Sequence, residues 1–227
     1  MTNRDLDRLW ESRASDLRTE HVNQIANRLA ADLTPVRPLP STGLLTTAFA
    51  LISAALVLLG GLALGDRALL RMDWTTALFT FAALAASVCL LSFALSGEMA
   101  PGSRRLAPTW ILALGILFGI AVLFAALFPY HEERSFWLHA WRCLRVGLAA
   151  GGLGAALFWL ILRRGAVLHR RTSGVLAGLL GGLTGTTILE VHCPNFNDAH
   201  ILVGHWGAAA VCAGVGWLAG AIADKRA

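Results

Sequence analysis

The chain of 227 residues is 56% hydrophobic and has a mean hydropathy of +0.61, whereas a soluble domain of this size is about 45–50% apolar. The composition therefore excludes an ordinary soluble domain. The formal net charge of +5 is attributed to the loops of a membrane protein, and no direct contact with nucleic acid is expected.

The first 40 residues form a polar head that carries six Arg and six acidic residues before any apolar run. No signal peptide is expected, because its apolar core would lie nearer the start. Apolar residues recur three, four or five apart along the head, which is approximately the spacing of one helix face. Prolines end this helix by about residue 35, because proline lacks the backbone N–H and disfavours helix before it.

The apolar face of the head needs a cover, because one amphipathic helix cannot bury its own face. It can lie on the bilayer, pack under the membrane domain or occupy a groove on a partner protein. The balance of positive and negative charge favours a protein partner, and packing against the rest of the chain stays open. The predicted contact residues are Leu17, Val22, Ile25, Leu29 and Leu33.

Six hydrophobic runs almost free of charge follow the head, at about residues 41–65, 74–97, 106–130, 146–162, 172–187 and 201–223. A helix needs about 20 mostly apolar residues to cross a bilayer, and the fourth and fifth runs reach that length only with their apolar neighbours. Lipid admits only helices or closed barrels, and no spanning strand pattern occurs. We predict an all-α bundle of six transmembrane helices over 41–227, preceded by the head and a Pro-rich linker over 1–40.

The distribution of Lys and Arg predicts the orientation. With the head inside, the inner segments hold 14 of these residues and the outer segments hold 5. Positive residues favour the cytoplasmic side, so both termini are expected in the cytoplasm. Tryptophans near the predicted span ends are expected to act as interfacial anchors; they are Trp74, Trp110, Trp137, Trp141 and Trp206.

Small residues recur four apart in several spans, as in Gly174, Gly178 and Gly182, which allows helix backbones to approach closely in lipid. Packing within one chain is the favoured interpretation, and a homodimer stays open. Ion-coupled transporters place ionisable groups at mid-membrane depth, whereas Glu190 and His205 lie near the outer ends of their spans. A small transporter or channel for an uncharged solute is therefore the alternative function.

Reactive residues concentrate on the predicted outer side. Cys143 and Cys193 both lie there, and an oxidising compartment would allow a disulfide if their Cα atoms come within about 7 Å. Thiolates with imidazoles also select soft metal ions, so a transient metal site is a second possibility. Its candidate ligands are Cys143, His192, Cys193, His200 and His205. The absence of Cys-x-x-Cys or His-x-x-x-His spacing weakens the metal signal. A purely structural disulfide, or a free cysteine among scattered interfacial histidines, stays open as the alternative to a sensing role.

No enzyme activity and no resident cofactor are expected. A cysteine hydrolase needs a nucleophile with an oriented base, and His192 is adjacent to Cys193, where neighbouring side chains seldom face one another. A redox enzyme that uses Cys143 and Cys193 as a dithiol is kept as a third hypothesis. The remaining cysteines, Cys89 and Cys212, fall within spans and are interpreted as small apolar fillers.

Four motifs, taken in order, resemble the bacterial negative regulator of sigma F family of six-span membrane anti-sigma factors. They are the junction Arg28-Leu-Ala-Ala-Asp32-Leu-Thr-Pro35-Val-Arg37-Pro-Leu; Trp141-Arg-Cys143-Leu followed by a Gly/Ala-rich span and Arg163-Arg164-Gly165-Ala166; Ser173-Gly174-Val-Leu-Ala-Gly178; and His192-Cys193-Pro194-Asn195 followed by His205-Trp206-Gly207. The resemblance covers about residues 28–40 and 137–220.

This resemblance implies a protein of the bacterial inner membrane whose N-terminal segment holds an extracytoplasmic-function sigma factor. It also implies that two outer-side cysteines, here Cys143 and Cys193, are needed for the response to a heavy metal or an oxidant. The orientation predicted from charge places these two cysteines on one side of the membrane, as that mechanism requires.

Overall fold

The computed structural model describes residues 20–31, 40–99, 108–131, 136–165, 167 and 169–225. The chain divides into two compact units, Met1–Pro38 and Leu39–Ala227. In the first unit, residues 20–31 form a helix. Three of the predicted contact residues are exposed on it, namely Val22 at 58%, Ile25 at 48% and Leu29 at 63%. The other two, Leu17 and Leu33, lie outside the described residues.

The described part of the second unit is helical and contains no strand. Its helices are α2 Thr42–Leu64, α3 Trp74–Met99, α4 Thr109–Leu127, α5 Phe136–Leu162, α6 Arg170–His192, α7 Asp198–His200, the π-helix η1 Ile201–Trp206, and α8 Gly207–Asp224. The last three form one continuous helix, Asp198–Asp224, and with it six helices are long and apolar enough to cross a membrane. The prediction of an all-α bundle with six spans is confirmed.

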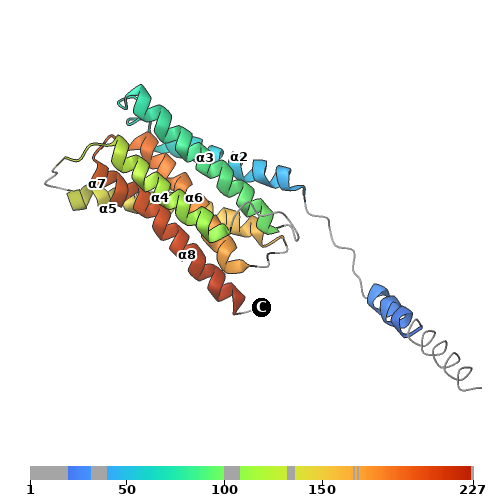
Figure 1. Cartoon of the computed structure of the whole chain (residues 1–227). Coiled ribbons are helices and arrows are strands. Elements are labelled where there is room, and N and C mark those ends of the chain that lie inside the picture. The colour runs from blue at the N-terminus through green and yellow to red at the C-terminus, as the bar shows by residue number, and fades with distance from the viewer. Residues whose placement is uncertain are drawn as a thin grey trace, which may run out of the picture. The chain divides into compact units, whose positions relative to one another are not determined.

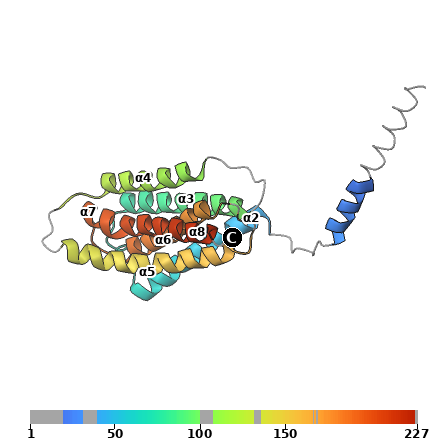
Figure 2. The ribbon, with the colours of Figure 1, turned by 90° about the horizontal axis from the view of Figure 1, so that it is seen from below.

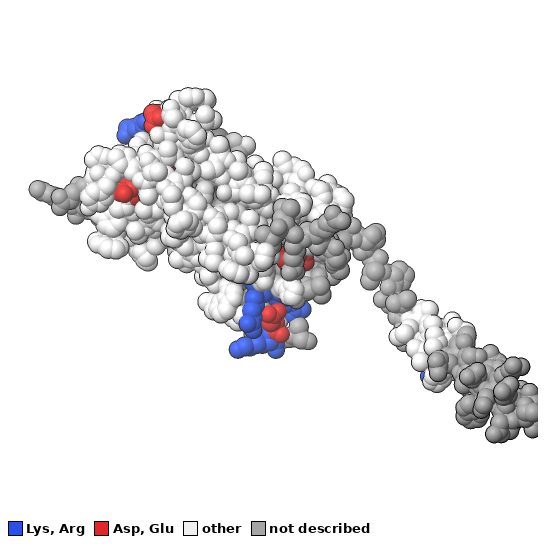
Figure 3. All heavy atoms as spheres, viewed as in Figure 1, with Lys and Arg blue, Asp and Glu red and all other residues white. Residues whose placement is uncertain are grey.

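The surface of this bundle matches a membrane protein. Figure 3 shows a largely uncharged face along the bundle, with the Lys and Arg atoms in two groups, a larger one where α8 ends and a smaller one at the upper left, each beside acidic atoms. Large apolar side chains are exposed on this surface, among them Leu58, Phe118 and Leu153. Because water disfavours an apolar surface of this extent, the protein is a membrane protein.

Two helices extend further than the apolar runs indicate. Helix α5 begins at Phe136, well before the predicted start near 146, and α6 runs from Arg170 to His192. Charged side chains are compatible with these ends because a long arginine keeps its head group in water while its stem packs on the helix. The guanidinium carbon of Arg145 lies 6.0 Å from the ring centroid of Trp141.

Helix α6 is the central helix of the bundle, and it lies among the other spans in both ribbon views (Figures 1 and 2). It is buried along most of its length. Its glycines make this possible, because a Cβ at Gly178 would overlap the carbonyl oxygen of Cys212 in α8. A Cβ at Gly181 would likewise overlap the backbone of Gly151 in α5. Close packing of small residues is the usual basis of helix association in lipid.

Contacts between helix ends define the two ends of the bundle. Where α2 and α6 end, His192 Nδ1 lies 3.3 Å from Gly65 O, and the Ala68 N–H donates to Val191 O at 3.1 Å. We call this the closed end. At the opposite end, Arg170 Nη1 donates to Ala223 O at 2.6 Å, where α6 begins and α8 finishes. This second end, called the junction end, is also where α2 begins after the first unit.

Trp206 does not have the position of an interfacial anchor. It lies within the last helix, and its indole Nε1–H donates to the carbonyl of Leu117 in α4 at 2.8 Å. The other four predicted anchors, Trp74, Trp110, Trp137 and Trp141, are exposed. Trp206 therefore joins η1 to α4 inside the bundle.

Candidate functional site

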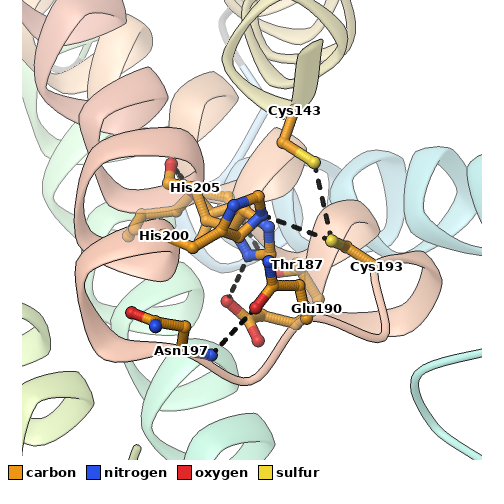
Figure 4. A network of polar contacts seen from close by, with 10 residues as sticks. Cys143, Thr187, Glu190, Cys193, Asn197, His200 and His205 are labelled. Atoms are coloured by element: carbon orange, nitrogen blue, oxygen red, sulfur yellow. Dashed lines mark hydrogen bonds and ion pairs between the residues drawn. The ribbon is translucent and has the colours of Figure 1, made fainter. Parts of the chain in front are cut away.

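Cys143 and Cys193 meet near the closed end of the bundle. Cys143 lies in the first third of α5, and Cys193 directly follows the last residue of α6. Their Sγ atoms are 3.5 Å apart, and the Cys143 thiol donates to the sulfur of Cys193 (Figure 4). Gly204 lets η1 lie close to α5 beside this pair, because a Cβ there would lie 3.3 Å from the Cβ of Cys143. The structure thus brings together the two cysteines predicted to respond to stress.

Two histidines complete the site. His200 Nε2 lies 3.4 Å from the Cys193 sulfur, and the rings of His200 and His205 meet edge to face with centroids 5.3 Å apart. Both histidines are fully buried. One ligand atom each from Cys143, Cys193, His200 and His205 lies within 4.8 Å of the others. We call these four residues the thiol–imidazole cluster.

A π-helical turn brings the two histidines onto one face. Residues five apart in a regular α-helix point about 140° away from each other, since each residue turns by about 100°. In η1 the N–H of Gly207 reaches back to the carbonyl of Leu202, a span of five residues. Such widened turns occur frequently at functional sites. The hydroxyl of Thr186 donates to the backbone carbonyl of His205 at 2.9 Å and supports this turn.

Glu190 is a further member of the site; the sequence placed it near Cys193 but not among the candidate ligands. Its Oε1 atom lies 2.7 Å from His205 Nδ1, and the Glu190 side chain is 1% exposed. The sequence signal is an ionisable residue near the outer end of its span, three residues before Cys193. Within the described residues, His205 Nε2 has no hydrogen-bond partner. The carboxylate therefore fixes one ring nitrogen, while the other remains available to the cluster.

His192 is not part of this site, although the sequence placed it among the candidate ligands. Its Nδ1 lies 3.3 Å from the carbonyl of Gly65 at the end of α2. The side chain of His192 leaves the last turn of α6 in another direction from that of Cys193. Adjacency in sequence thus gives no contact here.

The loop between α6 and α7 holds His200 in place. The Asn197 side chain accepts from the Ala199 N–H at 3.1 Å, which caps the last helix, and it donates to the carbonyl of His131. Phe196 stacks on Phe128 with ring planes 10° apart. These contacts tie the loop to the chain that follows α4, so the first turn of the last helix is fixed.

The site favours the thiolate form of Cys193. The hydrogen bond from Cys143 lowers the pKa of the Cys193 thiol; burial opposes this effect, and the imidazoles of His200 and His205 add to it. A thiolate is the form that binds metals and attacks disulfides. Two sulfurs in contact, one of them activated, can form a disulfide, and with the imidazoles they can bind a soft cation.

Comparison with known proteins identifies the family. The model of the negative regulator of sigma F (NrsF) family matches residues 29–223, which include the first five spans, nearly all of the sixth and the thiol–imidazole cluster. No curated protein and no solved structure matches the chain significantly. The match covers most of the chain and agrees with the resemblance carried by its motifs. The chain therefore belongs to the negative regulator of sigma F family and is a negative regulator of a sigma factor.

Proposed function

We propose that the protein is an anti-sigma factor of the bacterial inner membrane. Its N-terminal segment holds an extracytoplasmic-function sigma factor in the cytoplasm. A metal ion or an oxidant acting at Cys143 and Cys193 causes release of that sigma factor. The observation that carries the proposal is the thiol–thiol contact of 3.5 Å near the end of the bundle opposite the start of α2.

The sigma factor is held by the apolar face of the helix at residues 20–31. Val22, Ile25 and Leu29 are spaced three and four apart and are exposed, which is the pattern of a helix that fits an apolar groove. Full burial of one such side chain contributes about 1.5–3 kcal/mol. Three of them contribute enough to make this face the main contact with the sigma factor.

The charge distribution supports the orientation. If the head is cytoplasmic, the junction end faces the cytoplasm, and its arginines lie on the side that positive residues favour. Among them, Arg171 pairs with Asp224 at 3.2 Å. Both termini are then cytoplasmic, and the thiol–imidazole cluster lies towards the outer side, where disulfides form.

Helix α6 provides the route between the two ends. It has 23 residues and spans about 35 Å, from Arg170 at the junction end to the residue before Cys193. A change at the cluster acts on the head by favouring one packing of the bundle over another. A ligand shifts such an equilibrium only by its differential affinity for the two states.

The binding step is tested by co-purification of the tagged chain with the extracytoplasmic-function sigma factors of its own genome. A triple substitution of Val22, Ile25 and Leu29 by Asp should abolish capture of one sigma factor. Control variants place Asp on the other face of the helix, at Gln24 and Asn27, and these variants should retain capture.

Capture that resists the triple substitution would reject the proposed contact surface. Failure of the wild-type chain to hold any sigma factor under reducing or oxidising conditions would reject the anti-sigma mechanism. In that case the transport hypothesis would become the leading one.

A further inference from the structure

The thiol–imidazole cluster has the composition and spacing of a closed metal site. We propose that Cys143, Cys193, His200 and His205 together bind one soft divalent metal ion of the Zn²⁺ or Cd²⁺ class, with Glu190 positioning His205. This inference names the ligand of the site for which sensing is proposed above. It rests on that proposed function only for its biological role, because metal binding is measured without a sigma factor.

The distances fit tetrahedral coordination. With Zn–S bonds of about 2.3 Å and Zn–N bonds of about 2.0–2.1 Å, the sulfurs of such a site lie about 3.8 Å apart, and sulfur and nitrogen about 3.5 Å apart. The structure has 3.5 Å between the Cys143 and Cys193 sulfurs and 3.4 Å between Cys193 and His200 Nε2. These two distances fit to within about 0.3 Å, and the remaining pairs, all within 4.8 Å, need to close by at most about 1.5 Å to complete the coordination sphere.

His205 is prepared as a ligand. Its Nδ1 is held by the Glu190 carboxylate at 2.7 Å, so Nδ1 carries a proton, and in the neutral imidazole the lone pair is then on Nε2. This Nε2 is fully buried and has no hydrogen-bond partner among the described residues. A carboxylate behind a histidine is the usual outer-shell arrangement at metal sites, where it fixes the tautomer and raises the basicity of the ligand.

Charge and softness select the ion. Thiolates and imidazoles prefer soft or borderline cations, whereas Mg²⁺ and Ca²⁺ prefer oxygen ligands. The site is buried, and an uncompensated charge in such surroundings is costly. Two thiolates and two neutral imidazoles balance a divalent cation, and the Glu190 carboxylate is stabilised by its hydrogen bond with His205. Metal binding requires both cysteines as thiolates and both imidazoles neutral, so it is coupled to proton release.

Metal binding would join segments that are far apart in the sequence. Cys143 belongs to α5, Cys193 ends α6, and His200 and His205 belong to the last helix. With four protein ligands the ion has no open position, so the site has the form of a structural or sensing centre rather than a catalytic one. The cation would thus fix the relative positions of three helices near the closed end.

The test uses the full-length chain, reduced, stripped of metal and purified in detergent. Titration with Co²⁺ should give the intense visible bands of a tetrahedral cobalt centre together with thiolate-to-cobalt charge transfer, at one ion per chain. Cd²⁺ should displace the cobalt. A weak octahedral spectrum, or no charge transfer, would overturn the proposal, and this readout requires no variant.

Single substitutions then assign the ligands. His200→Gln and His205→Gln should each lower the affinity for Co²⁺ by at least about 100-fold, and Glu190→Gln should lower it by about 10–100-fold. The matched control is His192→Gln, which changes a histidine next to Cys193 but outside the cluster and should leave the affinity unchanged. Circular dichroism of each variant shows whether the helices are intact.

The two proposals can fail separately. Equal affinity of the His200→Gln and His205→Gln variants and the wild type would reject the four-ligand site, whether or not a sigma factor is captured. A tetrahedral cobalt spectrum in a chain that holds no sigma factor would support the site and reject the anti-sigma mechanism.

Discussion

His205 Nδ1 lies 2.7 Å from Glu190 Oε1, and neither side chain is more than 1% exposed. A buried donor that loses its acceptor costs about 1–3 kcal/mol. Glu190→Leu is therefore expected to lower the free energy of unfolding by at least this amount. Glu190→Gln keeps an acceptor oxygen and should cost less. Thermal unfolding in detergent measures the difference, and equal melting temperatures for the wild type and Glu190→Leu would show that the pair adds no stability.

Contact between the two sulfurs predicts rapid disulfide formation. In the metal-free chain, a mild thiol oxidant such as diamide should take up the two electrons and two protons released as Cys143 and Cys193 form one bond. Non-reducing mass mapping should find this bridge within the chain. Cys193→Ser should abolish it, and Cys212→Ser, the matched control in α8, should not. Saturation with Cd²⁺ should protect the thiols, whereas oxidation at an unchanged rate would contradict shared occupancy of the site.

The lowered pKa of the Cys193 thiol predicts an unusual pH profile of alkylation. The rate follows the thiolate fraction, which for a thiol of ordinary pKa falls about tenfold per pH unit below about 8.5. Because the folded chain keeps Cys193 ionised at lower pH, its rate should fall little between pH 8 and pH 6. Cys143→Ala removes the main cause of the shift and should restore a decline approaching 100-fold. Peptide mapping of iodoacetamide adducts gives both ratios, and parallel profiles would refute the assigned cause.

Packing of α6 against α8 should tolerate no added methyl at the closest approach. A Cβ at Gly178 would overlap the carbonyl of Cys212, whereas one at Gly152 in α5 meets nothing within 4 Å. Gly178→Ala is expected to lower the free energy of unfolding by about 1–3 kcal/mol. Gly152→Ala should leave it unchanged or raise it slightly, since alanine favours the helix by about 1 kcal/mol. A smaller loss at position 178 than at 152 would contradict the observed packing.

The spans could be predicted from the sequence because lipid imposes a strict rule on length and polarity. The ends of the spans could not be predicted, because the local hydropathy falls where arginines occur even though the helix continues. Arg145 in α5 and Arg170 in α6 are both helical, although each lies outside its predicted apolar run. Intrahelical hydrogen bonds continue through such residues without any need for apolar side chains.

The site was predictable in part. Charge counts placed Cys143 and Cys193 on one side of the membrane, and the structure brings their sulfurs into contact. The choice of histidines depended on local backbone geometry. His192 adjoins Cys193 in the sequence but contacts the end of α2. His200 and His205 are five residues apart, which is not a regular helical spacing, and they share one face because of the π-helical turn. No pattern in a single sequence indicates where such a turn will form.

The most direct test of the account measures sigma-factor release. A sigma factor captured on the immobilised full-length chain is exposed to Cd²⁺ or diamide, and the fraction that stays bound is followed for the wild type and for Cys193→Ser. The account predicts that both stimuli release the sigma factor from the wild type and that Cys193→Ser binds normally but retains it. Equal release from the two chains, or none from either, would contradict the assignment of the thiol–imidazole cluster as the sensor.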